Sequence, residues 1–165
     1  MRCRRAWVWA VLVVLAATGC TTQDPLQGLS ATQGATAPLD ARVPPPTGPV
    51  ALVPSQHVEA FLTSNRGEDA EFMVAAAMTI FRALYPGVAF LPNLVEARSR
   101  GMDRTIVLDV QGGPSRATIQ AVVLDRAMRP VSRIEAQGSD TEGNAARTYD
   151  RALVQLQQRT REVFP

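Results

Sequence analysis

Residues 104–138, RTIVLDVQGGPSRATIQAVVLDRAMRPVSRIEAQG, decide the fold of this chain. The run 104–110 is apolar at consecutive positions, which is typical of a strand covered on both faces, and the Gly-Gly-Pro at 112–114 ends it. Two further runs, 116–125 and 130–138, flank the turn 126–129 and predict an antiparallel hairpin. Apolar side chains alternate in the first of these runs, which favours one covered face: Ala117, Ile119, Ala121 and Val123.

Two strong helical patterns lie on either side of these strands. The first covers residues 67–87, where apolar residues recur at helical spacing until Pro86-Gly87 ends the helix. Its acids cluster in the first turn, where the helix dipole favours negative charge. The second helix is expected from about Asn144. We expect core-facing sides made of Phe72, Met73, Ala76, Ile80 and Leu84 in the first helix, and of Tyr149, Ala152, Leu153, Leu156, Thr160 and Val163 in the second.

Shorter elements complete the domain. VALVP at 50–54 predicts a buried strand, and 88–91 predicts a second short strand. Residues 55–62 fit either a short helix capped by Ser55 or a loop, and the sequence leaves both open. Asn93 and Glu96 form a capping box for a two-turn helix that Gly101 ends. The expected order is β-α-β-α-β-β-β-α, a single small α+β domain with helices against a mixed sheet.

The N-terminus carries an export signal. Three arginines within residues 1–5 precede twelve uncharged residues, 6–17. A positive start followed by a short apolar run and small residues is typical of a secretory signal. A transmembrane helix would need ~20 apolar residues.

The end of this run, Ala17-Thr18-Gly19-Cys20, resembles the lipobox of bacterial lipoproteins, although Ala17 replaces the usual Leu. The resemblance implies cleavage before Cys20 and attachment of acyl chains, such as palmitate, to that cysteine. Several chains at ~0.8 kcal/mol per buried CH₂ anchor a protein firmly in a membrane. Thr21 in place of Asp implies the outer membrane, facing the periplasm. The alternative is an ordinary secretory signal with an accidental cysteine.

Removal of the signal changes the composition. The chain has 17 basic residues, all of them arginine, and 15 acidic ones. Loss of the three signal arginines leaves 14 against 15, a net charge of −1, so the sequence gives no electrostatic case for nucleic acid. The only cysteines are Cys3, in the signal, and Cys20, so we expect no disulfide in the mature chain.

The chain therefore divides into a signal peptide at 1–19, a tether at 20–49 and a domain at 50–165. The tether is rich in Thr, Gln, Gly, Ala and Pro without apolar periodicity, which predicts disorder. Fully stretched, it would reach about 100 Å. The domain is long enough to fold alone.

Two stretches carry a further resemblance. In EARSRGMDRTIVLDV, 96–110, a Gly-x-Asp precedes the central strand. In QAVVLDRAMRPVSRIEAQG, 120–138, a strand ending in Asp, a turn and a strand ending in Gly follow one another. With the opening strand 50–54, they resemble a group of bacterial envelope domains that includes CsgG, LpoB and the N-terminal domain of TolB. Met128-Arg129-Pro130 departs from the Thr-Gly usual in that turn. The resemblance implies an α+β fold over about 50–160 that binds partners through its surface.

Few residues are candidates for chemistry. His57 is the only histidine, and we expect a surface or capping role for it rather than catalysis. No serine lies in a Gly-x-Ser-x-Gly motif, so a catalytic triad is not predicted. Asp103 is expected to bind backbone N–H groups in a turn. Asp109, if buried, needs a partner such as Arg126 or Arg133, and is otherwise exposed at the strand end.

The loop 138–144 loosely resembles an oxygen-ligand site for calcium, but a polar loop leading to a helix cap is the preferred interpretation. We therefore expect no metal, no cofactor and no enzyme activity. The sequence favours a non-enzymatic interaction or regulatory module for an envelope assembly, wall-synthesis or secretion machine. The alternative is an oligomeric component of a secretion complex. Expected partners are the membrane and an unidentified envelope protein. The sequence is also compatible with binding to further copies of the chain. Arginines on the last helix form a candidate partner-facing stripe, or a solvated face: Arg147, Arg151, Arg159 and Arg161.

Overall fold

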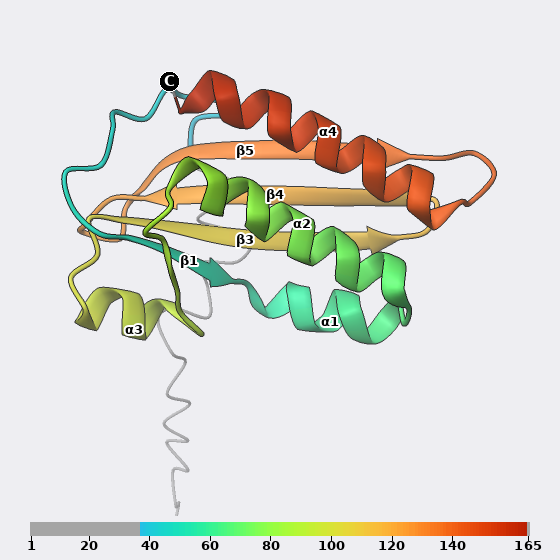
Figure 1. Cartoon of the computed structure of the whole chain (residues 1–165), viewed down its shortest axis with the longest axis horizontal. Coiled ribbons are helices and arrows are strands. Elements are labelled where there is room, and N and C mark those ends of the chain that lie inside the picture. Colours follow the sequence, from blue (N-terminus) through green and yellow to red (C-terminus); the bar gives the residue numbers. More distant parts are fainter. Residues whose placement is uncertain (1–36, 165) are drawn as a thin grey trace, which may run out of the picture.

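The computed structural model describes residues 37–164. The predicted signal peptide, Cys20 and the first part of the predicted tether lie outside the described residues. The chain forms β1 (Val50–Pro54), α1 (Gln56–Ser64), α2 (Glu68–Leu84), β2 (Ala89–Phe90), α3 (Leu94–Ser99), β3 (Arg104–Gly113), β4 (Arg116–Leu124), β5 (Pro130–Ser139) and α4 (Ala145–Val163) (Figure 1).

The five strands form one mixed sheet in the order β2-β1-β3-β4-β5. β1 is parallel to both β2 and β3, whereas β3, β4 and β5 are antiparallel to one another. The predicted α+β class and the hairpin around 126–129 are confirmed. β3 ends within the predicted 112–114, but it runs past the expected residue 110, because Gly112 and Gly113 continue the ladder to Arg116. A Cβ on Gly112 would lie 2.2 Å from the carbonyl oxygen of Arg116, so only glycine fits there.

The helices cover the two sides of the sheet unequally. α2 and α4 lie side by side over one face, and their apolar residues form the larger core with that face of β1, β3, β4 and β5 (Figure 1). α3 contributes Leu94 and Ala97 to a smaller core on the other face, with Val53 and Val107. In the part of the chain that the structure describes, no helix is long and apolar enough to cross a membrane.

The segment 55–62, which fits either a helix or a loop by sequence, forms the helix α1 with Ser55 as its N-cap. The order therefore has one more helix than expected. β1 has only five residues and β3 has ten, so the edge of β3 would lack a neighbour beyond Leu108. α1 fills this position: the Ser55 N–H donates to the Leu108 oxygen at 2.7 Å, and the Asn65 side chain donates to the Gly112 oxygen at 3.1 Å.

The expected orientation of α2 is partly wrong. Met73 is buried as expected, but Phe72 is 68% exposed. The side that packs against the sheet and α4 includes Ala70 and Ala77, whose small side chains let the helix approach closely. The helix is therefore rotated so that Phe72 points away from the core.

Part of the predicted tether is packed on the domain. Leu39 forms a parallel bridge with Arg133 at the outer edge of β5. The Asp40 N–H donates to the Arg133 oxygen at 2.8 Å, and the Val43 N–H donates to the Val163 oxygen at 2.9 Å. We call residues 37–43 the strap. Within the described residues, the packed part of the chain thus begins before the expected boundary at residue 50, because backbone groups of 37–43 pair with the edge of β5, a signal that composition does not carry.

Candidate functional site

The carboxylate of Asp109 is the centre of a polar cluster at the junction of β1 and α1. Asp109 is only 3% exposed. Asp109 Oδ1 accepts hydrogen bonds from Ser55 Oγ and, at 3.0 Å, from His57 Nδ1. Oδ2 accepts one from Gln111 Nε2 at 2.8 Å. The expectation of a buried, partnered carboxylate is confirmed, but the expected arginine partner is wrong.

The local fold explains why the partners come from α1. Pro54 ends β1, and Ser55 is the N-cap of α1, accepting a hydrogen bond from the His57 N–H at 3.2 Å. Ser55 and His57 therefore lie beside the middle of β3, next to Asp109. Arg133 pairs with Val122 on β4, and Arg126 lies in the β4–β5 turn. Neither element adjoins the edge of β3 that Asp109 faces.

The geometry of the cluster differs from that of a nucleophilic triad. In a triad the serine hydroxyl donates to the histidine, which in turn donates to the carboxylate. Here Ser55 and His57 both donate to the same oxygen of Asp109. The His57 side chain, 41% exposed, borders a shallow hollow of about 220 Å³ with Ala60 and Gln111. Among residues 37–164, no group of three or more metal-ligating side chains is found. The cluster ties α1 to β3.

Asp103 holds the chain that enters β1. Its Oδ2 accepts a hydrogen bond from the Thr47 N–H at 2.8 Å, and its own N–H donates to the Pro49 oxygen at 2.8 Å. Asp103 binds a backbone N–H, as expected, but the expectation that this N–H lies in its own turn is wrong. The bond spans 56 positions of sequence instead of closing a local turn.

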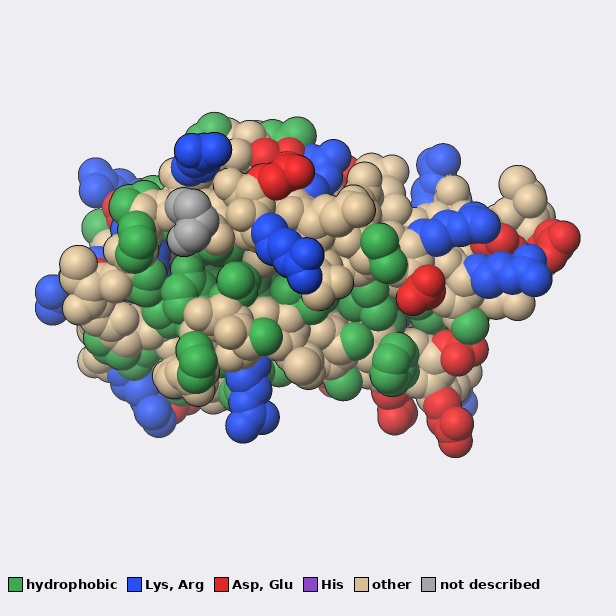
Figure 2. Space-filling view, turned by 45° about the horizontal axis from the view of Figure 1, so that its top comes forward, with side chains coloured by type: hydrophobic (Ala, Val, Ile, Leu, Met, Phe, Trp, Pro, Cys, Tyr) green, Lys and Arg blue, Asp and Glu red, His purple; other side chains and the backbone are tan. Residues whose placement is uncertain are grey.

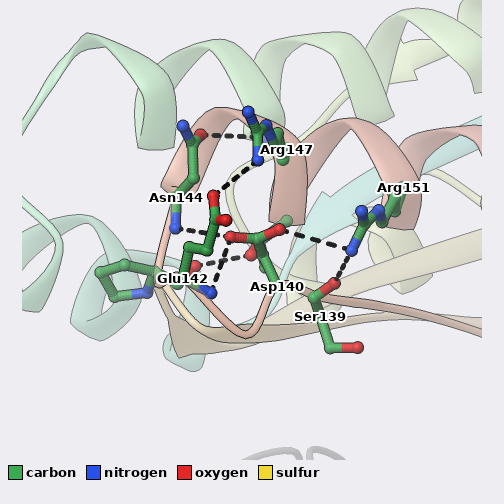
Figure 3. A network of polar contacts seen from close by, with 8 residues as sticks. Ser139, Asp140, Glu142, Asn144, Arg147 and Arg151 are labelled. Atoms are coloured by element: carbon green, nitrogen blue, oxygen red, sulfur yellow. Dashed lines mark hydrogen bonds and ion pairs between the residues drawn. The ribbon is translucent and has the colours of Figure 1, made fainter.

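The loop before α4 is a helix cap, as preferred from the sequence (Figure 3). Buried Asp140 accepts hydrogen bonds from the N–H groups of Glu142, at 3.2 Å, and Asn144, at 3.0 Å. Asn144 then caps α4 by accepting from the Arg147 N–H at 3.1 Å. The carboxylate of Glu142 points toward Arg147, with 2.8 Å between the charged atoms. These side chains satisfy one another.

Three of the four candidate arginines of α4 have partners within the domain. Arg147 pairs with Glu142, and Arg151 lies 3.5 Å from Asp140 and donates to the Ser139 oxygen. Arg159 pairs with Asp40 of the strap. Arg161 borders a small hollow between α2 and α4. Their role as a partner-facing stripe stays a prediction.

One surface feature includes residues that the sequence pattern places in the core, namely Phe72, Ala76 and Ile80. The outward side of α2, which we call the α2 face, is apolar: Phe72, Ala75, Ala76, Thr79, Ile80 and Ala83, all exposed or half-buried. Thr79 donates its hydroxyl to the Ala75 oxygen at 2.9 Å, so its polar group is satisfied within the helix. Figure 2 shows apolar side chains spread over the face that α2 and α4 form. The sequence does carry a signal for this face: residues 72–81 include no charged side chain. A helix with only one buried side would have charged residues on its other side within such a run.

Comparisons with known proteins give no family for this chain. No protein-family model matches, and no curated protein matches. Among solved structures, a methionine variant of the PelC dodecamer from Paraburkholderia phytofirmans is 15% identical with a TM-score of 0.47, covering 76% of this chain and 95% of that chain. A second PelC dodecamer structure is 16% identical, with a TM-score of 0.47 and coverage of 74% and 92%. Protein VC0702 from Vibrio cholerae is 9% identical, with a TM-score of 0.32 and coverage of 72% and 100%.

Proposed function

We propose that this chain is a lipid-anchored envelope protein that faces the periplasm from the outer membrane and acts as a non-enzymatic interaction module. Its partner would be an assembly, wall-synthesis or secretion machine of the envelope. The observation that carries the proposal is the α2 face, because an exposed apolar surface on a helix with a large aromatic residue marks a protein contact.

The lipobox-like sequence at Cys20 supports the membrane anchor. Because the strap is packed on the domain from Ala37, the distance from a lipid at Cys20 to the domain is limited by the length of the stretch 20–37. That stretch reaches at most about 60 Å. The partner therefore has to lie near the membrane that holds the anchor.

The polar cluster around Asp109 supports the non-enzymatic part of the proposal. Its serine and histidine both donate to the carboxylate, so the histidine is not placed to take a proton from the serine as it would in a triad. A buried carboxylate held by these hydrogen bonds fixes α1 in place, and this structural role is sufficient to explain its burial.

Photo-crosslinking in living cells tests the proposal. A photoreactive amino acid replaces Phe72 in the full-length chain, and the matched control carries it at Val95 on α3, which is 51% exposed. We expect discrete adducts from position 72 and a much weaker signal from position 95. Equal adducts from both positions, or none from position 72, would contradict the interaction surface.

The anchor is tested separately with Cys20→Ser. We expect this variant to leave the membrane fraction and appear in the soluble fraction of the envelope. Retention of the variant in membranes would refute the lipid anchor without affecting the crosslinking result.

The second candidate function, an oligomeric component of a secretion complex, is favoured by a specific observation. The two ends of the α2 face carry opposite charge, with Glu68, Asp69 and Glu71 at one end and Arg82 at the other. Such a surface is complementary to a reversed copy of itself.

A further inference from the structure

We propose that the α2 face binds the α2 face of a second copy of this chain, with the two helices antiparallel about a two-fold axis. The proposal rests on the proposed function, because it names the partner that the α2 face would bind. α2 has 17 residues, which makes it about 25 Å long. A two-fold contact uses the same surface patch twice, so the patch has to be complementary to itself.

The sizes of the side chains meet this condition. Phe72 projects near the N-terminal end of the face, and Ala83 leaves space near the C-terminal end. In an antiparallel pair centred between Ala76 and Thr79, Phe72 of each copy lies over Ala83 of the other. Alanine at 75 and 76 allows the two helices to approach to the 8–10 Å typical of packed helices.

The charges agree with the same register. Exposed Glu71 precedes Phe72, and exposed Arg82 precedes Ala83. Centring the pair between Ala76 and Thr79 therefore also places Glu71 beside Arg82 of the second copy. A parallel pair would instead place acid against acid and arginine against arginine. Complementary charges at the edge of a contact select its orientation more than they add to its affinity.

The neighbouring charges reinforce this difference between the ends. Glu68 and Asp69 also lie at the N-terminal end of α2. Arg66, which precedes the helix, is the basic residue nearest to them in the sequence. At the C-terminal end, Arg161 of α4 borders the same hollow as Ile80 and Ala83. In the antiparallel pair, the three acids at the N-terminal end of one copy thus face the end of the other copy that carries Arg82 and Arg161.

Burial of the face leaves no polar group unpaired. Thr79 is its only polar member, and its hydroxyl already donates to the Ala75 oxygen. Burying an unpaired hydroxyl would cost about 1–3 kcal/mol, a cost that this contact avoids. If Cys20 is lipidated, the copies share one membrane surface, so a modest contact suffices because confinement raises the effective concentration.

The test uses engineered cysteines in the full-length chain, whose own cysteines are Cys3 and Cys20. Ala76→Cys lies next to the proposed axis, and Val95→Cys on α3 is the matched control. Both variants are treated in cells with a short bis-maleimide. We expect at least a tenfold higher yield of crosslinked dimer from A76C than from V95C or the parent chain. Equal yields would overturn the proposal.

A charge exchange tests the orientation of the helices. In the A76C background, Glu71→Arg alone places two arginines together in the antiparallel pair, and we expect the crosslinking yield to fall several-fold. Adding Arg82→Glu restores the opposite charges, so the double variant should regain the original yield. A yield that stays low in the double variant, or never falls in the single one, would overturn the antiparallel register.

Failure of this inference differs from failure of the proposed function. If the photoreactive residue at position 72 captures another protein while A76C gives no dimer, the second-copy proposal is wrong and the interaction module stands. If position 72 captures only the chain itself, both the A76C dimer and the charge exchange should agree with it.

Discussion

At the scale of single residues, the cluster around Asp109 shows how one buried charge is held. Three side chains donate to its carboxylate, two from the start of α1 and one from β3 itself. A buried carboxylate that loses donors keeps its desolvation cost without the compensating bonds. The cluster should therefore dominate the attachment of α1.

His57→Ala is expected to lower the free energy of unfolding by about 1–3 kcal/mol, because it leaves Asp109 one donor short. Urea unfolding followed by circular dichroism measures the change. Arg126→Ala is the control: this exposed residue lies in the β4–β5 turn, away from the carboxylate, and should change stability by less than ~0.5 kcal/mol. The reverse order of effects would mean that an arginine, and not α1, holds Asp109.

Asp125 gives a prediction about pH. Burial alone would raise the pKa of its carboxyl. Four interactions outweigh this effect of burial and lower the pKa: hydrogen bonds from the backbone and the guanidinium of Arg129, the charge of that guanidinium, and a hydrogen bond from the backbone N–H of Ala127. A folded pKa below the unfolded value of about 3.9 means that the carboxylate stabilises the protein above that pH. The contribution disappears as the pH falls through the folded pKa.

Asp125→Asn should therefore be less stable than the parent chain at pH 7, with the difference shrinking below about pH 4, where the parent's carboxylate also takes up its proton. Urea unfolding at pH 7, 4 and 3 measures the two curves. A difference that stays constant over this range would assign the effect to the shape of the turn and not to its charge.

At the scale of elements, Gly138 determines how closely α4 lies on β5. A Cβ at this position would lie 1.8 Å from the Thr148 oxygen and 2.8 Å from the Ala152 nitrogen. Both are backbone atoms of α4, so neither can rotate away. The sequence indicates a glycine at the end of this strand, but only the packed helix explains why glycine is needed.

Gly138→Ala should lower the free energy of unfolding by about 2–4 kcal/mol, in the range of overpacked core sites. The melting temperature should fall with it. Gly87→Ala is the matched control, because its Cβ would meet no atom within 4 Å and its effect should be small. Similar losses in both variants would show that α4 can shift at little cost.

The elements that sequence could predict are those with a local signal. The runs 104–110 and 116–138 alternate or stay apolar over whole strands, and α4 presents a regular apolar side, so β3, β4, β5 and α4 follow from pattern alone. α1 depends on the unfilled edge of β3, which no local pattern shows. The rotation of α2 depends on where alanine allows close packing, so Phe72 was placed on the wrong side. The partners of Asp109 depend on β1 ending early.

At the scale of the whole molecule, the strap extends the domain toward its N-terminus. It contributes buried Ala37 and Val43, backbone bonds to β5 and α4, a bond from Ser132 Oγ to the Ala41 oxygen at 2.7 Å, and the pair of Asp40 with Arg159. None of these contacts survives in a fragment that begins at Val50.

A fragment 37–165 should therefore be more stable than a fragment 50–165, by about 2 kcal/mol from the two buried side chains and the bonds to the sheet edge. Urea unfolding of the two purified fragments measures the difference. The shorter fragment should also associate more readily, because its β5 edge is uncovered. Equal stability of the two fragments would show that the strap rests on the domain without contributing to its stability.

The strap also has a mechanical consequence for a chain held at Cys20. If the proposed anchor at Cys20 holds the chain, a pull on it would load the strap, whose bonds to the sheet edge include that from the Arg133 N–H to the Pro38 oxygen. Loss of these contacts would lengthen the connection between anchor and domain without breaking contacts within the core of α2, α4 and the sheet. Release as far as Val50 lengthens the connection from about 60 Å to about 100 Å. The contacts of the strap would thus set how far the domain can move from the membrane that holds the proposed anchor.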